Sequence, residues 1–297
     1  MTRRHRRALF GAIAVVLVSA AVPSCGRGDA ASDGDGGPEG SASAATPRSA
    51  LPADCPTTVP ERLVPQVVRE LAHSTDAFTE GLVVHDGVLY ESNGLEGRSS
   101  VRALDPDTGA VRRNVAVDPA VFAEGLAVGT DGQLVQLTWK DGRAYVRDAA
   151  TLEELRRFEY RGEGWGLTTL DDGTLVMSDG SDQLVERDPE DFSRLRRWKV
   201  SRVGGAVDQL NELDWDGQHL WANRWQTDEI VRIDPRCRRV DAVVDASSLV
   251  ASATAAARAG GTPIDVLNGI AHLPGTDRFL VTGKLWPVMY EVRFVPA

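Results

Sequence analysis

Lysine, cysteine and histidine are scarce in this chain, and the scarcity limits the chemistry that it can perform. The 297 residues include only three lysines, three cysteines and five scattered histidines. The sequence has no HExxH motif, no Walker-type phosphate loop and no GxSxG motif. Zinc hydrolysis and nucleophilic triads are therefore unsupported, and no residue pattern predicts a metal site.

Long apolar runs are also lacking beyond the N-terminus, and acidic residues outnumber basic ones. No run after residue 25 reaches the 18 apolar residues that a membrane span needs. The formal net charge is -10, and the first 24 residues carry four arginines and no acid, so the remainder has a charge near -14. A body this acidic is unsuited to nucleic acid or anionic lipid, and we expect neither surface as a partner.

The first 58 residues predict an export signal and a linker. A basic segment, 3–7, precedes 15 apolar residues, 8–22, and small residues then lead to Cys25. This ending resembles a bacterial lipoprotein signal, so residues 1–25 predict export with lipidation of Cys25; the alternative is a cleaved signal with an incidental cysteine. We expect an exported protein of the cell envelope, lipid-anchored on the outer side of the membrane or secreted. Residues 26–58, rich in Gly, Ser, Ala, Asp and Pro, predict a flexible linker.

The remaining residues, 59–297, repeat a pattern of short strands. Similar segments are centred on positions 81, 125, 166, 212 and 269, at spacings of 44, 41, 46 and 57 residues. Each segment is followed by a second strand and then by two more strands, which a turn beginning with Asp joins in the first four units. Four strands at this period are typical of a propeller blade. The sequence therefore predicts an all-β, five-bladed β-propeller.

Three features complete this predicted propeller. The last unit lacks a fourth strand, and we expect the segment from Leu63 to Leu71 to close the ring as the outer strand of the last blade. An alanine-rich segment near 248–260 predicts a short helical insertion. Cys55 and Cys237 fall on the same side of adjacent blades, so a disulfide between them is a reasonable hypothesis, with two buried free thiols as the alternative.

The topology predicts that polar and aromatic residues gather around one mouth of the central funnel. Strands alternate in direction within a blade, so the start of the first strand and the end of the second lie on one face. The residues expected there include Glu80, Glu124, Trp139, Trp165, Asn211, Trp225, Asn268 and Lys284. The tryptophans would wall an apolar pocket for a small ligand, or else pack between blades.

Glu80 and Glu124 occupy equivalent positions in adjacent units, so their side chains are expected to approach each other. Pairing of two carboxyl groups in a site lined by tryptophan raises the pKa of one of them, which then exchanges protons near neutral pH. The alternatives are two independently solvated acids or an acidic ring that binds a cation.

At these positions the chain resembles the plant-type and bacterial glutamine cyclotransferase family. The resemblance runs in order from about residue 64 to the C-terminus. It is carried by the segments 78–82 (FTEGL), 90–100 (YESNGLEGRSS), 162–167 (GEGWGL), 210–213 (LNEL), 221–228 (WANRWQTD), 265–270 (DVLNGI) and 281–287 (VTGKLWP). Members of this family are five-bladed propellers that convert an N-terminal glutaminyl residue to pyroglutamyl with loss of ammonia.

The resemblance implies a role for each funnel residue. Glu124 would be the proton shuttle, Glu80 would hold the substrate α-amine, and Asn211 and Lys284 would donate hydrogen bonds to the carbonyl or the scissile amide. Plant members have Gln at the position of Glu80, so the resemblance leaves the role of this residue open. The residues expected to bind substrate are Trp165, Trp225, Trp139, Phe78, Phe122 and Asn268.

The family reaction implies no metal and no cofactor for catalysis, although a structural calcium ion in the central tunnel stays open. The implied partners are peptides or proteins with N-terminal Gln, the chain is expected to be a monomer, and contact with a membrane is expected only through the lipid anchor. Two alternatives remain: a non-catalytic propeller of the envelope that binds peptides or glycans, and a calcium-dependent propeller lactonase.

Overall fold

The computed structural model describes residues 51–53, 55 and 57–297 of the chain. The predicted signal segment 1–25, with Cys25, and most of the predicted linker 26–58 lie outside these described residues. The described part is built from β-strands and one helix, as the repeat predicted. None of its helices has the length and apolar character needed to cross a bilayer.

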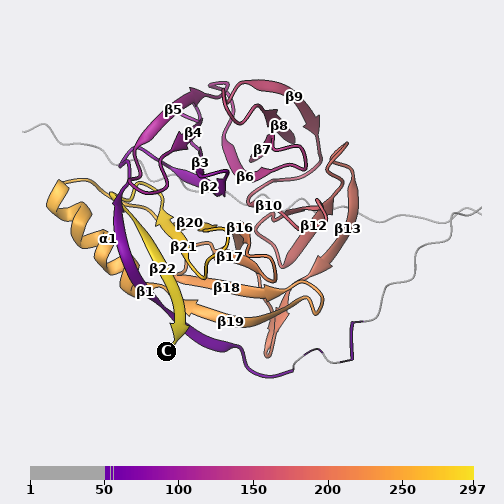
Figure 1. The fold of residues 1–297 in the computed structure, drawn as a ribbon. Coiled ribbons are helices and arrows are strands. Elements are labelled where there is room, and N and C mark those ends of the chain that lie inside the picture. The colour runs from indigo at the N-terminus through magenta and orange to yellow at the C-terminus, as the bar shows by residue number, and fades with distance from the viewer. Residues whose placement is uncertain (1–50, 54, 56) are drawn as a thin grey trace, which may run out of the picture. The chain divides into compact units, whose positions relative to one another are not determined.

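Three sheets each contain four consecutive antiparallel strands (Figure 1). The first sheet consists of β2 (Thr79–His85), β3 (Val88–Asn93), β4 (Ser100–Leu104) and β5 (Val111–Ala116). The second consists of β6 (Ala123–Val128), β7 (Leu134–Thr138), β8 (Arg143–Arg147) and β9 (Glu154–Glu159). The third consists of β10 (Leu167–Thr169), β11 (Leu175–Met177), β12 (Gln183–Arg187) and β13 (Arg194–Lys199). These are the first three predicted repeat units.

The remaining strands of the described residues form one larger sheet, built mainly from two four-stranded groups. The first group is β16 (Leu210–Trp215), β17 (Leu220–Arg224), β18 (Glu229–Asp234) and β19 (Arg239–Asp245). The second group is β20 (Leu267–His272), β21 (Phe279–Gly283), β22 (Val288–Pro296) and β1 (Glu61–Ala72). A short hairpin, β14 (Ser201–Arg202) and β15 (Gly205–Ala206), which the repeat pattern did not predict, pairs with β19.

β1 joins the start of the described chain to its end. It pairs antiparallel with β22 along most of its length, and its first residues pair in parallel with β19. The predicted closure by this strand is therefore confirmed. A disulfide joins Cys55 to Cys237, whose Cα atoms are 5.4 Å apart, and links the segment before β1 to the turn between β18 and β19. The β1–β22 pairing therefore holds the two ends of this unit together, and the disulfide fixes the segment before β1 to an internal turn.

The innermost strands β2, β6, β10, β16 and β20 contact one another in cyclic order, giving a propeller-like arrangement of sheets. The repeated glycine of the sequence pattern explains this close approach. A Cβ atom added to Gly81 would lie 2.5 Å from Leu126 N, and one added to Gly166 would lie 2.1 Å from Asn211 O. Only glycine leaves room for neighbouring backbones at these positions.

Glu212 occupies the equivalent position in β16. Its carboxyl group accepts hydrogen bonds from the backbone N–H groups of Leu82 (3.0 Å) and Ile270 (3.3 Å), which belong to two other inner strands. Burial raises its pKa well above the ordinary range. Among the described residues, no group of three or more His, Cys, Asp or Glu side chains is arranged to hold a metal ion.

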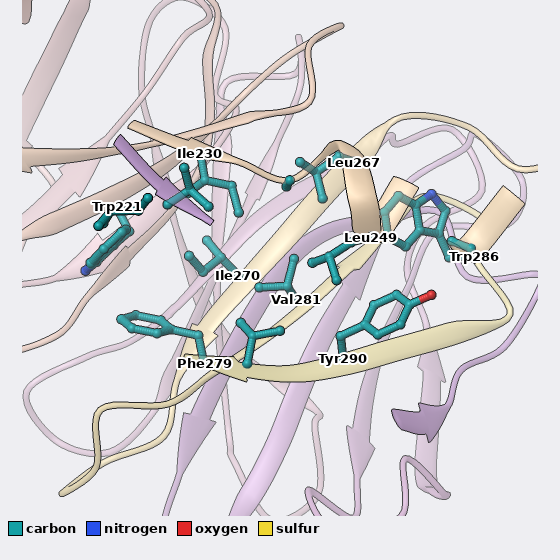
Figure 2. Close-up of a cluster of buried hydrophobic side chains, with 14 of the residues drawn as sticks. Trp221, Ile230, Leu249, Leu267, Ile270, Phe279, Val281, Trp286 and Tyr290 are labelled. Carbon is teal, nitrogen blue, oxygen red and sulfur yellow. The ribbon is translucent and has the colours of Figure 1, made fainter. Parts of the chain in front are cut away.

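The predicted insertion is the helix α1 (Ser247–Gly260), which lies between β19 and β20 in the chain. It ends at Gly261, whose φ of 72° gives the left-handed conformation typical of a helix C-terminus. The helix buries Leu249, Ala253 and Ala257. Figure 2 shows Leu249 in the apolar cluster that also contains Val281 and other residues of the last strands. The helix thus covers the outside of the group formed by β20, β21, β22 and β1 (Figure 1).

Candidate active site

A cavity of about 370 Å³ opens where the first strand of several sheets begins and the second strand ends. It contains both predicted carboxyl groups, the predicted lysine and all three predicted tryptophans. Its lining residues are Phe78, Glu80, Phe122, Glu124, Trp139, Trp165, Asn211, Trp225, Gln226, Asp265, Val266 and Lys284. A larger groove of about 650 Å³ lies beside β1 and β19, but its charged residues are exposed or half-buried at the surface.

The floor of the cavity holds two carboxyl groups and one ammonium group. Glu80 is 1% exposed, and Glu124 and Lys284 are each 6% exposed. Lys284 donates a hydrogen bond from Nζ to Glu80 Oε1 at 2.6 Å, and its Nζ lies 4.7 Å from the ring centroid of Phe78. A buried charge needs a partner, and this ion pair supplies one for both groups.

The two carboxyl groups also influence each other, and each shifts the pKa of its neighbour. Burial and the neighbouring Glu80 raise the pKa of Glu124 well above its ordinary value. Burial also raises the pKa of Glu80, but there Lys284 opposes the shift. Lys284 therefore favours the ionised form of Glu80, and the larger rise at Glu124 favours its protonated form. The structure places both of these acids in the lining of one cavity, as the repeat predicted.

Two asparagines lie close to this floor in different positions. Asn211 lines the cavity, and its Oδ1 atom is buried without a hydrogen-bond partner among the described residues. Asn268 was also predicted to bind substrate, but the structure buries it completely behind the cavity wall. Its Nδ2 atom donates to Thr79 O at 3.0 Å and to Glu80 Oε2 at 3.3 Å. Asn268 therefore orients Glu80 and does not face the cavity, because its strand turns its side chain toward the neighbouring strand β2.

Aromatic rings form the walls in two rows. Phe78 and Phe122 meet edge to face at 6.1 Å, and Phe122 meets Trp139 in the same way at 5.6 Å. Trp165 and Trp225 form the second row, with ring centroids 5.4 Å apart. All five rings are only half-buried, whereas Trp198, Trp221 and Trp286 are buried. Half-buried rings around a polar floor are suited to holding a small ligand.

Known proteins are similar to this chain in sequence and in fold. A sequence model of the family described as glutamine cyclotransferase matches residues 41–294. A glutaminyl-peptide cyclotransferase of Arabidopsis thaliana is 37% identical over 234 residues, which span 78% of this chain and 72% of the relative. The crystal structure of Myxococcus xanthus glutaminyl cyclase matches with a TM-score of 0.72 and 37% identity, and the match covers 80% of this chain and 99% of that one.

The chain belongs to the glutamine cyclotransferase family. Its members in the comparison include one from a plant and one from a bacterium, and both match across most of the described residues. The family resemblance stated from the sequence segments is thus confirmed.

Sequence reasoning missed three residues that line the cavity of this glutamine cyclotransferase family member. Gln226 follows Trp225 in a turn where its φ is 59°, and Asp265 and Val266 directly precede β20. The repeat offered a usable signal for the last two, because residues just before an inner strand face the cavity in other units. Asp265 is exposed, and its Oδ1 atom accepts a hydrogen bond from Val266 N at 2.6 Å.

Sequence reasoning also missed a fourth residue, Glu163, which contacts two of the tryptophans. Its Oε2 atom accepts hydrogen bonds from Nε1 of Trp139 (2.8 Å) and from Nε1 of Trp165 (3.1 Å). Nothing in the spacing of the repeat identified it, because the contact depends on two indoles from different sheets meeting at one point.

Proposed function

We propose that this chain is a glutaminyl-peptide cyclotransferase, which converts an N-terminal glutaminyl residue to a pyroglutamyl residue and releases ammonia. The observation that carries the proposal is the buried pair of Glu80 and Glu124 beside Lys284 in an aromatic cavity. The α-amine of the substrate is itself the nucleophile. The protein therefore has to hold the glutamine side chain folded, transfer a proton and stabilise an oxyanion.

The paired carboxyl groups fit the required proton transfer because both pKa values are raised, that of Glu124 more strongly. As the α-amine nitrogen bonds to the side-chain carboxamide carbon, the ionised Glu80 accepts the proton that this nitrogen loses. Glu124 donates its proton to the amide nitrogen as the carbon–nitrogen bond breaks and ammonia leaves. The proton then passes from Glu80 to Glu124 through their hydrogen bond, so the site returns to its starting state.

Lys284 and Asn211 are assigned to the developing oxyanion and the amide. The ammonium group of Lys284 is held on the floor by Glu80, so its position is set before substrate binds. The unpartnered Oδ1 atom of Asn211 is able to accept a hydrogen bond from the substrate carboxamide, and its Nδ2 group is able to donate one. A polar group buried without a partner is costly, and a bound carboxamide removes that cost.

The aromatic rows exclude water from the methylene groups of the substrate. A glutamine side chain must fold back for the α-nitrogen to reach the carboxamide carbon, and a narrow apolar wall favours the folded form. We assign this role to Trp165 and Trp225 on one side and to Phe78, Phe122 and Trp139 on the other.

We also propose that the sheets form a five-bladed propeller in which β1 completes the last blade. The cyclic contacts of the innermost strands and the pairing of β1 with β22 support this count. In such a ring, the beginnings of the inner strands converge on the axis, which accounts for residues from distant parts of the chain lining one cavity.

The experiment that tests the function is mass spectrometry of a synthetic peptide with N-terminal Gln after incubation with purified residues 51–297. Loss of one ammonia from the peptide, and none from its N-acetylated form, is the expected result, since acetylation blocks the α-nitrogen. Unchanged peptide would favour the alternative of a non-catalytic peptide or glycan binder. The same assay after EDTA treatment tests the calcium-dependent alternative, and we expect full activity because the proposed steps use only side chains.

We propose that the protein acts as a monomer outside the cytoplasm, attached to the membrane through a lipid on Cys25 or secreted, on peptides or proteins with N-terminal Gln. The Cys55–Cys237 disulfide supports export, because such bonds persist in oxidising compartments. The sequence signal at residues 1–25 supports the anchor. Incorporation of a labelled fatty acid into the full chain, and its absence in Cys25→Ser, would support lipidation; equal labelling would refute it.

A further inference from the structure

Glu163 lies where the two aromatic rows of the cavity come closest. It belongs to the loop between β9 and β10, and it is half-buried. One of its oxygens, Oε2, accepts the indole N–H groups of both Trp139 and Trp165. Trp139 ends the row that begins at Phe78, and Trp165 begins the row that ends at Trp225.

The backbone directly after Glu163 is held by hydrogen bonds from two successive residues. Gly164 N donates to Trp139 O at 3.1 Å, and Trp165 N donates to Ser178 O at 3.0 Å. The ring of Trp165 packs over Gly180, where an added Cβ atom would come within 2.6 Å of it. The loop therefore cannot shift without moving one of the two indoles, and hydrogen bonds to a charged acceptor are among the stronger ones in proteins.

We infer that Glu163 is a positioning residue that joins the two aromatic rows into one wall and thereby sets the affinity of the site for the glutaminyl side chain. This inference rests on the proposed function. Glu163 touches neither the floor carboxyls nor, on the proposed binding mode, the reacting atoms, so it acts through the indoles. Its charge has a second effect: the carboxylate of Glu163 contributes to raising the pKa of Glu124.

Two variants separate the hydrogen bonds from the charge. Glu163→Ala removes the acceptor from both indoles, and we expect KM for a peptide with N-terminal Gln to rise at least about tenfold, with kcat within about threefold of wild type. Glu163→Gln keeps an acceptor oxygen and loses the charge. We expect it to restore KM to near the wild-type value and to move the pKa of Glu124, read from the pH profile of kcat/KM, to a lower value.

A matched control is Glu190→Ala, which removes a glutamate from the exposed turn between β12 and β13. It should leave KM, kcat and the near-ultraviolet circular dichroism of the indoles unchanged. The dichroism should change in Glu163→Ala and not in Glu163→Gln. This optical reading decides whether Glu163 orders the indoles even if no peptide is turned over.

Wild-type KM and wild-type dichroism in Glu163→Ala would overturn the inference, whereas absence of ammonia release by the wild type would overturn only the proposed function. If Glu163→Ala fails to fold, the double variant Trp139→Phe with Trp165→Phe provides the test, because it removes both N–H donors and leaves a phenyl ring at each position. A KM raised about tenfold in that variant supports the inference, and an unchanged KM refutes it.

Discussion

Replacing Glu124 with Gln removes a titrating proton from the cavity while preserving the size of the side chain. The carboxamide still hydrogen-bonds to Glu80, so the floor should keep its shape and KM should stay near the wild-type value. The carboxamide has no acidic proton to deliver to the departing nitrogen. Glu124 is buried in the same cavity floor as Glu80 and Lys284.

Loss of a positioned proton donor lowers turnover by about 10² to 10⁴, which corresponds to about 3–5 kcal/mol of transition-state stabilisation. The assay is ammonia release from a peptide with N-terminal Gln at saturating concentration, with Glu190→Ala as the control. A kcat for Glu124→Gln within about threefold of wild type would remove Glu124 from the proton transfer and refute the reasoning.

The Glu124→Gln variant should also change how the stability of the protein depends on pH. The pKa of Glu124 is raised in the folded state, so its contribution to stability is complete below its unfolded value, about 4.3, and is lost as the pH rises through the folded value. Gln does not titrate. The melting temperature of Glu124→Gln should therefore fall less than that of the wild type as the pH rises above about 4.3. Parallel curves for the two proteins would show that the pKa of this group is not raised.

Three further perturbations test the fold around the site. Asp214 is buried and its pKa is raised to about 8, so its stabilising contribution is complete below about pH 4 and is lost as the pH rises through about 8. Asp214→Asn should therefore flatten the decline of the unfolding free energy with pH, measured by urea titration. An unchanged slope of unfolding free energy against pH would contradict the raised pKa. Cys237→Ser opens a covalent link between residues 182 positions apart and should lower the free energy of unfolding by about 2–5 kcal/mol with kcat retained; unchanged urea unfolding would argue against the disulfide. Gly180→Ala, at a φ of 79°, pushes a methyl group against Trp165 and should raise KM more than it lowers kcat, whereas unaltered kinetics would show that the ring moves freely.

The sequence predicted the residues of the cavity floor because they recur at one place in a repeat. Glu80 and Glu124 occupy equivalent positions, each directly before the centre of its repeat unit. Segments around these positions also carried the family resemblance. Lys284 and Asn211 followed from the same alternation of strands. Prediction failed for Asn268, although its position in the repeat is equivalent, because which way a buried amide turns depends on the atoms of the adjacent strand.

The repeat period, the closing strand, the helix and the candidate acids were determined by the sequence alone, since each is a local pattern of strand, turn or charge. The tertiary structure alone decided which charges and rings meet. Glu163 bonds two indoles from different sheets, Glu212 reaches the backbone of two other inner strands, and Lys284 pairs with a carboxylate 204 residues away. These contacts depend on the convergence of the inner strands at the axis, and pKa values that arise from burial and proximity become defined only when that convergence is complete.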